Sequence, residues 1–385
     1  MTLHLTNARI VTPAGTVTGT LSCEDGVIVA VREGMLPVGT GGERIDVGEG
    51  YLLPGFIDTQ VNGGAGVLLN DDPTVEGIAA IGRAHRAFGT TGYLPTLISD
   101  RLDVIDIAMR AAEQAVAQGV PGALGIHIEG PFISSERKGI HNPNLFRTLD
   151  AESKALLKSL KHGKTLVTLA PENCTPDDIA ELSDAGIILS AGHTNATFET
   201  TRAAFASGVS GVTHLFNAMS PMTHRAPGVV GAALENQSVY CGLICDGRHV
   251  DWAVLRIVLR TRPHGRFMLV TDAMPTVGSK TKTFALNGQH IHVEDGVCID
   301  GNGTLAGSDL DMATAVRNTL LHLGVDVLDA AIMAATAPAQ FLGLDDTRGS
   351  LAVGKRADIV WMNSNFEVVQ TFIATASTAD PLVKA

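Results

Sequence analysis

The chain repeats a pattern of a short apolar run, polar residues at the end of that run, and a longer stretch with helical spacing. Eight apolar runs follow this pattern, at 54–62, 91–99, 122–131, 165–173, 186–194, 211–219, 239–247 and 266–274. Amphipathic stretches such as "TVEGIAAIGRAHRAFG" and "VIDIAMRAAEQAVAQG" lie between them. About eight strand–helix units predict an α/β fold of the (β/α)8 TIM-barrel type. A doubly wound open sheet is the alternative, but no GxGxxG motif follows the first run.

Both ends of the chain show short strands separated by turns. The first fifty residues alternate apolar and polar positions around Asp25-Gly26, a pair that favours a two-residue hairpin. Residues 349–373 show the same pattern of short strands separated by turns. Neither end has enough apolar surface to fold alone. We therefore expect residues 1–52 and 346–385 to form one small β-sandwich domain beside a catalytic barrel at 53–345. Helices at 309–324 and 327–343 are expected to pack outside the barrel.

Composition narrows the class of function. The 385 residues are 45% hydrophobic and carry a formal net charge of −12, which argues against a general nucleic-acid surface. No apolar run approaches the ~18 residues that cross a bilayer, and the start shows no signal-peptide pattern. The five cysteines are scattered without CxxC spacing, which suits a reducing compartment. We therefore expect a cytoplasmic location, with no nucleic-acid or membrane partner.

Polar residues at four run ends carry the candidate chemistry. They are Glu129 in "HIEGP", His193 in "AGHTNAT", His214 in "THLFNAM" and Asp272 in "VTDAM". Barrel enzymes keep their chemistry at the carboxyl ends of the strands. One carboxylate and two imidazoles at this mouth make a three-ligand site with an open position for water, which is the pattern of a catalytic zinc site. Asp272 would then lie close to the metal and its water.

Two further polar residues lie deeper in the same runs. His127 precedes Glu129 by two positions and faces the same side of its strand, so it is an alternative ligand. Its deeper position favours a supporting role. Asp58 lies deeper than Gln60 and either supports the site or has a structural role.

A series of motifs resembles the N-acetylglucosamine-6-phosphate deacetylase family of the amidohydrolase superfamily. In order they are "PGFIDTQVNGG", "HIEGPFIS", "KGIHNP", "AGHTNAT", "THLFNAMSPM", "DGRHV", "LVTDAM", "LAGSDLDM" and "GSLAVGKRADIVW". The match runs through almost the whole chain and is specific in combination, whereas "PGFID" or "KRADIV" alone would indicate only the superfamily. The resemblance implies hydrolysis of a linear amide, in which N-acetyl-D-glucosamine 6-phosphate gives D-glucosamine 6-phosphate and acetate.

The first strand separates two types within that family, one with His-x-His and one with Gln-x-Asn. This sequence has Gln60 and Asn62 there. Neutral amides are weaker ligands than imidazole for ions such as zinc. The resemblance therefore implies that a second metal site is lost. One divalent ion per subunit would remain, with zinc favoured over iron, manganese and cobalt, on Glu129, His193 and His214.

The resemblance also implies how the reaction proceeds. The metal would activate a water molecule, and Asp272 would accept the proton of that water and deliver it to the leaving nitrogen, first as general base and then as general acid. His141 in "GIHNP" would hydrogen-bond the substrate near its carbonyl.

The remaining positions carried by the resemblance meet the sugar and its phosphate. Arg225 and His249 match the phosphate-binding positions, which suits an anionic substrate. The positions expected to meet or close over the sugar are Asn217, Ala218, Leu305, Ala306 and Gly307. The family is generally dimeric, so we expect a homodimer in which some phosphate contacts come from the neighbouring subunit.

Two other functions are possible for a chain of this pattern. A dihydroorotase-like or dipeptidase-like amidohydrolase would place a lysine, often carbamylated, at the end of the fourth run, which here reads "TLAPEN" without one. A metal-free sugar-phosphate-binding protein would use the barrel only as a scaffold and would carry no ion after purification.

Overall fold

Eight parallel strands form a barrel in the computed structural model, which describes residues 2–374 and 376–377. They are β6 (Phe56–Val61), β9 (Thr90–Ile98), β10 (Gly125–Glu129), β11 (Lys164–Leu169), β12 (Ile188–Ala191), β13 (Val209–Val212), β14 (Tyr240–Leu243) and β15 (Phe267–Leu269). Their order in the sheet follows the order in the chain. The parallel bridge between Val61 and Ala273 joins the two ends of the sheet. The predicted (β/α)8 barrel is confirmed, and an open doubly wound sheet is excluded.

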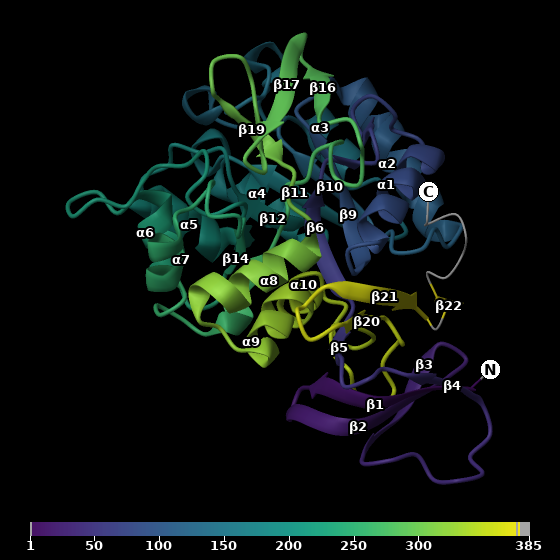
Figure 1. Ribbon diagram of the computed structural model, residues 1–385. Helices are drawn as coiled ribbons and strands as arrows, with labels where there is room; N and C mark the ends of the chain where they lie inside the picture. The colour runs from purple at the N-terminus through teal and green to yellow at the C-terminus, as the bar shows by residue number, and fades with distance from the viewer. Residues whose placement is uncertain (1, 375, 378–385) are drawn as a thin grey trace.

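Helices surround the barrel (Figure 1). In α1 the buried residues include Ile78, Ile81 and His85, which share one face at helical spacing, and Thr74 caps the first turn. The barrel helices are α1 (Val75–Arg86), α2 (Leu102–Ala117), α3 (Ala151–Leu157), α4 (Pro176–Asp184), α5 (Phe198–Ser207), α6 (Gly228–Glu235) and α7 (Trp252–Val258). Short 3-10 turns lie at Ser135–Arg137, Pro143–Leu145, Pro171–Asn173 and His264–Arg266.

Two predicted stretches after the last barrel strand are helical and lie outside the barrel. The first is α8 (Met312–Leu323). The second contains α9 (Val327–Ala331), a π-helical turn (Ile332–Thr336) and α10 (Ala337–Phe341). These helices lie between the barrel and the sheet formed by the chain ends (Figure 1).

The two chain ends share one sheet. Its strands are β1 (Thr2–Thr12), β2 (Gly15–Glu24), β3 (Val27–Glu33), β4 (Glu43–Asp46), β5 (Tyr51–Pro54), β20 (Ile359–Met362), β21 (Val368–Ile373) and β22 (Ala376–Ser377). β5 joins the ends, since it pairs with β1 on one side and β20 on the other. Asp25 and Gly26 both have left-handed φ values, 47° and 83°, as a tight hairpin requires. The domain boundaries stay a prediction, and residues 1, 375 and 378–385 of the smaller domain lie outside the described residues.

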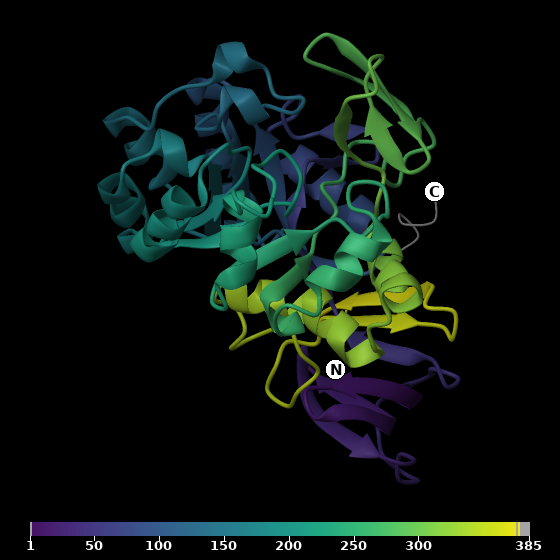
Figure 2. The same ribbon diagram turned by 90° about the vertical axis from the view of Figure 1, so that its left-hand side faces the viewer.

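A small antiparallel sheet follows the barrel and was not predicted from the sequence. It consists of β16 (Thr283–Leu286), β17 (Gln289–Glu294), β18 (Val297–Ile299) and β19 (Leu305–Ser308). It lies at one end of the barrel, and the sheet formed by the two chain ends lies at the other (Figures 1 and 2). Ser308 bridges Ala273, so β19 is tied to the end of the last barrel strand. A two-stranded ribbon of β7 (Gly63–Gly64) and β8 (Val67–Leu68) follows the first barrel strand.

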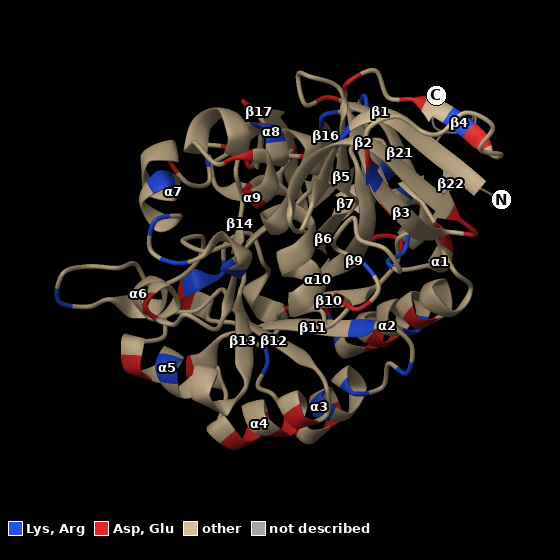
Figure 3. Ribbon diagram, turned by 90° about the horizontal axis from the view of Figure 1, so that it is seen from below, with Lys and Arg blue, Asp and Glu red and all other residues tan. Residues whose placement is uncertain are grey.

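The outer helices carry charges of both signs. Figure 3 shows Lys and Arg beside Asp and Glu on α2, α3 and α5, whereas α4 carries only Asp and Glu. Lys154 on α3 pairs with Asp178 and Glu181 on α4 at 2.8 and 2.5 Å. Within the described part of the chain, no helix has the length and apolar character needed to cross a membrane.

Candidate metal centre and substrate pocket

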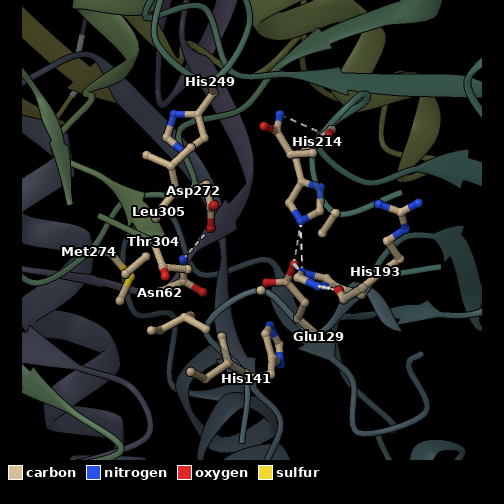
Figure 4. A pocket seen from close by; sticks show the side chains of 18 of the residues that line it. Asn62, Glu129, His141, His193, His214, His249, Asp272, Met274, Thr304 and Leu305 are labelled. Carbon is tan, nitrogen blue, oxygen red and sulfur yellow. Dashed lines mark hydrogen bonds and ion pairs between the residues drawn. The ribbon is translucent and has the colours of Figure 1, made fainter. Parts of the chain in front are cut away.

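Glu129, His193 and His214 converge at the carboxyl ends of three barrel strands. Glu129 is the last residue of β10, and each histidine follows its strand by two positions. The Nε2 atoms of His193 and His214 lie 3.2 and 3.1 Å from Glu129 Oε1, and 3.1 Å from each other (Figure 4). All three side chains are buried. Among the described residues they form the one cluster of three such groups that is tight enough for a metal ion.

Three residues at the mouth of the barrel have strained backbone conformations. His193, His214 and Asp272 have φ values of 47°, 32° and 53°, in the left-handed region that L-residues other than glycine seldom adopt. Each such residue costs on the order of 1–3 kcal/mol. Strain of this kind gathers at functional sites, where the surrounding structure holds it in place.

The donor set fits a divalent cation. His193 Nδ1 lies 2.9 Å from the carbonyl oxygen of Arg137, which only accepts, so Nδ1 carries the proton. In the neutral ring Nε2 then directs a lone pair toward a carboxylate oxygen and a second imidazole nitrogen. Lone pairs this close repel unless a cation lies between them. Ligand atoms about 2.0–2.1 Å from a tetrahedral zinc ion lie roughly 3.3–3.4 Å apart, near the 3.1–3.2 Å separations found here.

The charges at this cluster depend on each other. Burial opposes ionisation of Glu129, but its contacts with His193 and His214 outweigh it and hold the pKa of its carboxyl well below the ordinary value. Burial opposes a charge on His214 too, yet the contact with Glu129 raises its pKa overall. The site is therefore built around an ionised carboxylate.

Asp272 lies beside the cluster and is held by two amides. Asn62 Nδ2 donates to Asp272 Oδ1 at 2.7 Å. Gln60 Nε2 is within hydrogen-bonding distance of the same oxygen, at 3.2 Å, and of Glu129 Oε1, at 3.0 Å. Burial and the nearby charge of Glu129 raise the pKa of Asp272. The two amides thus contact the carboxylates where the resemblance implied a lost metal.

His127 and Asp58 lie deeper in the barrel than the cluster, and both make hydrogen bonds to other residues. His127 lies between two hydroxyl groups, with Nδ1 3.2 Å from Thr96 Oγ1 and Nε2 2.7 Å from Thr168 Oγ1. Asp58 accepts hydrogen bonds from the Thr271 hydroxyl at 2.5 Å and from the backbone of Gln60 at 3.1 Å. His127 is therefore placed outside the group of ligands, and Asp58 supports the strand end that carries Gln60.

His141 lies against the cluster with its ring 4.4 Å from that of His193. The backbone N–H of Ser99 donates to His141 Nδ1 at 3.3 Å, and the Ser99 hydroxyl lies 2.7 Å from the same nitrogen. A nitrogen that accepts a backbone N–H bears a lone pair, so the proton of the neutral ring is on Nε2. His141 thus offers one N–H group as a donor.

His249 is fixed by Asp246 across the turn that follows β14. His249 Nδ1 lies 2.6 Å from Asp246 Oδ2, while Asp246 Oδ1 accepts from the backbone N–H groups of Arg248 and His249 at 2.8 Å. Burial opposes ionisation of Asp246, but the contact with His249 lowers its pKa overall. The ring of His249 is therefore held with Nδ1 on the carboxylate.

These side chains line a pocket of about 360 Å³ at the barrel mouth (Figure 4). That volume lies in the range of about 300–1,000 Å³ found for small-molecule sites. The sequence-predicted residues that line it are Asn62, Glu129, His141, His193, His214, Asn217, Ala218, His249, Asp272, Leu305, Ala306 and Gly307. The Leu305–Gly307 segment belongs to β19, so the unpredicted sheet supplies one wall.

Two predicted residues do not line this pocket: Gln60, which contacts Glu129 and Asp272, and Arg225. Arg225 is exposed, on the loop between β13 and α6 that extends away from the barrel (Figure 1). Sequence reasoning also missed Arg137, which lines the pocket and donates from Nε to Asn195 at 2.9 Å. The basic "ERKG" stretch was the only feature of the sequence that pointed to Arg137. Asp246 had a clearer signal, because it precedes His249 by three positions.

Comparisons with known proteins show what this chain is similar to. Residues 51–376 match the sequence model of the amidohydrolase family. An N-acetylgalactosamine-6-phosphate deacetylase from Shewanella sp. (strain ANA-3) is 42% identical over 325 residues, which are 84% of this chain and 82% of that protein. The crystal structure of N-acetylglucosamine-6-phosphate deacetylase from Pasteurella multocida has a TM-score of 0.94 and 34% identity, and covers 99% of this chain and 100% of that one. A mutant of the Mycobacterium smegmatis deacetylase in complex with N-acetyl-D-glucosamine-6-phosphate has a TM-score of 0.88 and 31% identity, with 98% of each chain covered.

Proposed function

The chain belongs to the amidohydrolase family, and from that premise we propose that it is a metal-dependent deacetylase of N-acetyl-D-glucosamine 6-phosphate. The reaction adds water across the acetamide bond and yields D-glucosamine 6-phosphate and acetate. The observation that carries the proposal is the convergence of Glu129, His193 and His214 beside Asp272 in one pocket. The relatives named for this activity, and the one bound to this sugar phosphate, support the choice of substrate.

A second substrate is favoured by one observation. The Shewanella relative, which is 42% identical, is named for N-acetylgalactosamine 6-phosphate. A Haemophilus influenzae relative named for N-acetylglucosamine 6-phosphate is 36% identical. The two sugars differ only in the configuration of one hydroxyl, so the same acetamide chemistry serves both. N-acetyl-D-galactosamine 6-phosphate is therefore the alternative substrate.

Glu129, His193 and His214 would hold one divalent ion, with zinc first and iron, manganese or cobalt as alternatives. When bound, the ion supplies Lewis acidity to water and to the acetyl carbonyl. The Nδ1 proton of His193 on the Arg137 carbonyl keeps its Nε2 available as a ligand atom. Gln60 and Asn62, as amides, would leave the second position without a metal.

Asp272 would move the proton. Its Oδ1 is occupied by the two amides, and no hydrogen bond among the described residues uses Oδ2. Its raised pKa suits a group that takes a proton from water and then gives it to the leaving nitrogen. The water oxygen would join the acetyl carbon, the carbon–nitrogen bond would break, and the amine would leave with the proton that Asp272 delivers.

Other groups would bind and orient the substrate. His141 would donate from Nε2 to the acetyl carbonyl, and His249 would meet the phosphate. Asn217 and Ala218 would contact the sugar, with the wall of Leu305, Ala306 and Gly307 beside it. Because Arg225 projects away from its own pocket, we assign it to the phosphate site of a neighbouring subunit in a homodimer. The five cysteines are free thiols, which supports a cytoplasmic location.

A substrate comparison tests the proposed function. Purified protein is incubated with each of the two N-acetylhexosamine 6-phosphates, and acetate and free amine are measured together. Equal amounts of acetate and amine are expected, and the larger kcat/KM identifies the preferred sugar. Absence of release from both compounds, from protein that contains metal, would reject the proposal.

A further inference from the structure

Gln60 and Asn62 direct their amide nitrogens at carboxylates. Gln60 Nε2 carries two N–H groups and lies between Glu129 Oε1 and Asp272 Oδ1, at 3.0 and 3.2 Å. Asn62 Nδ2 lies 2.7 Å from Asp272 Oδ1. An ionised carboxylate only accepts hydrogen bonds, so the nitrogen of each amide must face it. The orientation of both amides is thus set by their partners.

The backbone holds these groups in register across the closure of the barrel. The N–H of Asp272 donates to the carbonyl of Gln60 at 3.0 Å, and the N–H of Asn62 donates to the carbonyl of Ala273 at 2.9 Å. Gln60 and Asn62 are 2% and 1% exposed. Both side chains are therefore buried where they contact the carboxylates.

Gln60 and Asn62 differ in the carboxylates that they contact. Both amides contact Asp272. Gln60 alone contacts Glu129, through the oxygen on which both histidine nitrogens converge. Asn62 contacts Asp272 but has no hydrogen bond to Glu129 among the described residues. Its own Oδ1 is buried without a partner in the described chain, although it belongs to a side chain that lines the pocket. A water molecule or a bound molecule in the pocket can supply the donor for this acceptor.

From this arrangement, and resting on the proposed function, we infer that Gln60 and Asn62 are positioning residues with separate roles. Gln60 orients the oxygen with which Glu129 binds the metal. Asn62 fixes Asp272 by one oxygen, so that the other oxygen faces the reacting water. The amides are therefore working parts of the one-metal site and not only remnants of a two-metal site.

Two pairs of variants test this division of roles. Asn62→Leu and Gln60→Leu remove the N–H donors, while Asn62→Asp and Gln60→Glu keep the size of each side chain and replace N–H by oxygen. For each variant, kcat and KM are measured with metal in excess, and metal affinity is measured separately by competition with a chromogenic chelator. Asn236→Leu is the control, because it removes an amide whose hydrogen bonds serve a turn at the opposite end of β14.

The Asn62 variants should lose roughly 100-fold or more in kcat, the scale of a positioned base, with KM and metal affinity near those of the unaltered protein. The Gln60 variants should in addition bind metal about 10- to 100-fold more weakly, as expected for a group that orients a metal ligand. Asn236→Leu should change neither quantity.

Other outcomes would overturn the inference. Asn62 variants that keep kcat within about threefold would show that Asp272 does not need Asn62. Equal losses of metal affinity in the Asn62 and Gln60 variants would show a general collapse of the site. If the unaltered protein releases no acetate, the proposed function fails, yet the chelator competition still decides whether Gln60 supports Glu129.

Discussion

Ser99 fixes the tautomer of His141. Both the backbone N–H and the hydroxyl of Ser99 are directed at His141 Nδ1, at 3.3 and 2.7 Å. Gly130 makes room for this contact, since a Cβ atom there would lie 2.2 Å from Ser99 Oγ. The neutral ring is thereby left with its proton on Nε2, on a residue that lines the pocket.

Ser99→Ala should therefore lower kcat by roughly tenfold. The variant loses the hydroxyl, which is one of the two Ser99 groups that contact His141 Nδ1, and with it about one hydrogen bond. Ser99→Thr retains the hydroxyl and is the matched control. Nitrogen-15 NMR of the histidine rings reads the tautomer directly. An unchanged His141 tautomer together with unchanged kcat in Ser99→Ala would show that the hydroxyl has no part in placing this proton.

Asp272→Asn should retain metal and fold but lose several orders of magnitude in kcat, because an amide cannot accept the proton of water. The new amide would also place an N–H or a carbonyl against Asn62, so the Asp272→Ala variant is a useful companion. Turnover and metal content are measured on the same preparations. Near-normal turnover in either variant would contradict the role assigned to Asp272.

Arg225→Ala should raise KM for the phosphorylated sugar far more than KM for unphosphorylated N-acetylglucosamine, because the lost contact is with the phosphate. His224→Ala, on the same exposed loop, is the control. If Arg225 acts across a dimer, mixing Arg225→Ala with Asp272→Asn subunits should restore some dimers with one intact site. Equal effects on both sugars would remove Arg225 from the phosphate site.

Gln60→His combined with Asn62→His should raise the metal content from one toward two ions per chain, because imidazole is a stronger ligand than an amide at these positions. Elemental analysis after dialysis against zinc gives the stoichiometry. A ratio that stays at one would mean that features other than these amides exclude the second ion.

Much of the barrel and of its candidate metal centre could be predicted because the relevant signals are local. Each strand is a short apolar run, and Glu129, His193, His214 and Asp272 each follow such a run. Barrel topology then places strand ends together whatever the separation in sequence. The left-handed φ values of His193, His214 and Asp272 could not be predicted in this way, since they are set by the turns after the strands.

The parts that sequence reasoning missed depend on contacts between distant segments. The sheet of β16–β19 did carry local signals, for Asn287-Gly288 and Asp295-Gly296 have the left-handed φ values of tight hairpin turns. Nothing local showed that its last strand would line the pocket. The contact of Ser99 with His141 and the two-sided contact of Gln60 join residues 42 to 212 positions apart. A sequence motif identified Arg225, but the direction of its side chain depends on the path of an exposed loop.

The central claim is that Glu129, His193 and His214 hold one ion on which hydrolysis depends. It is tested most directly by removing metal with a chelator, adding zinc back in measured steps, and following acetate release from N-acetyl-D-glucosamine 6-phosphate. We predict that release is lost with the metal and returns in proportion to added zinc, with a break at one ion per chain. Full release from metal-free protein would contradict the account.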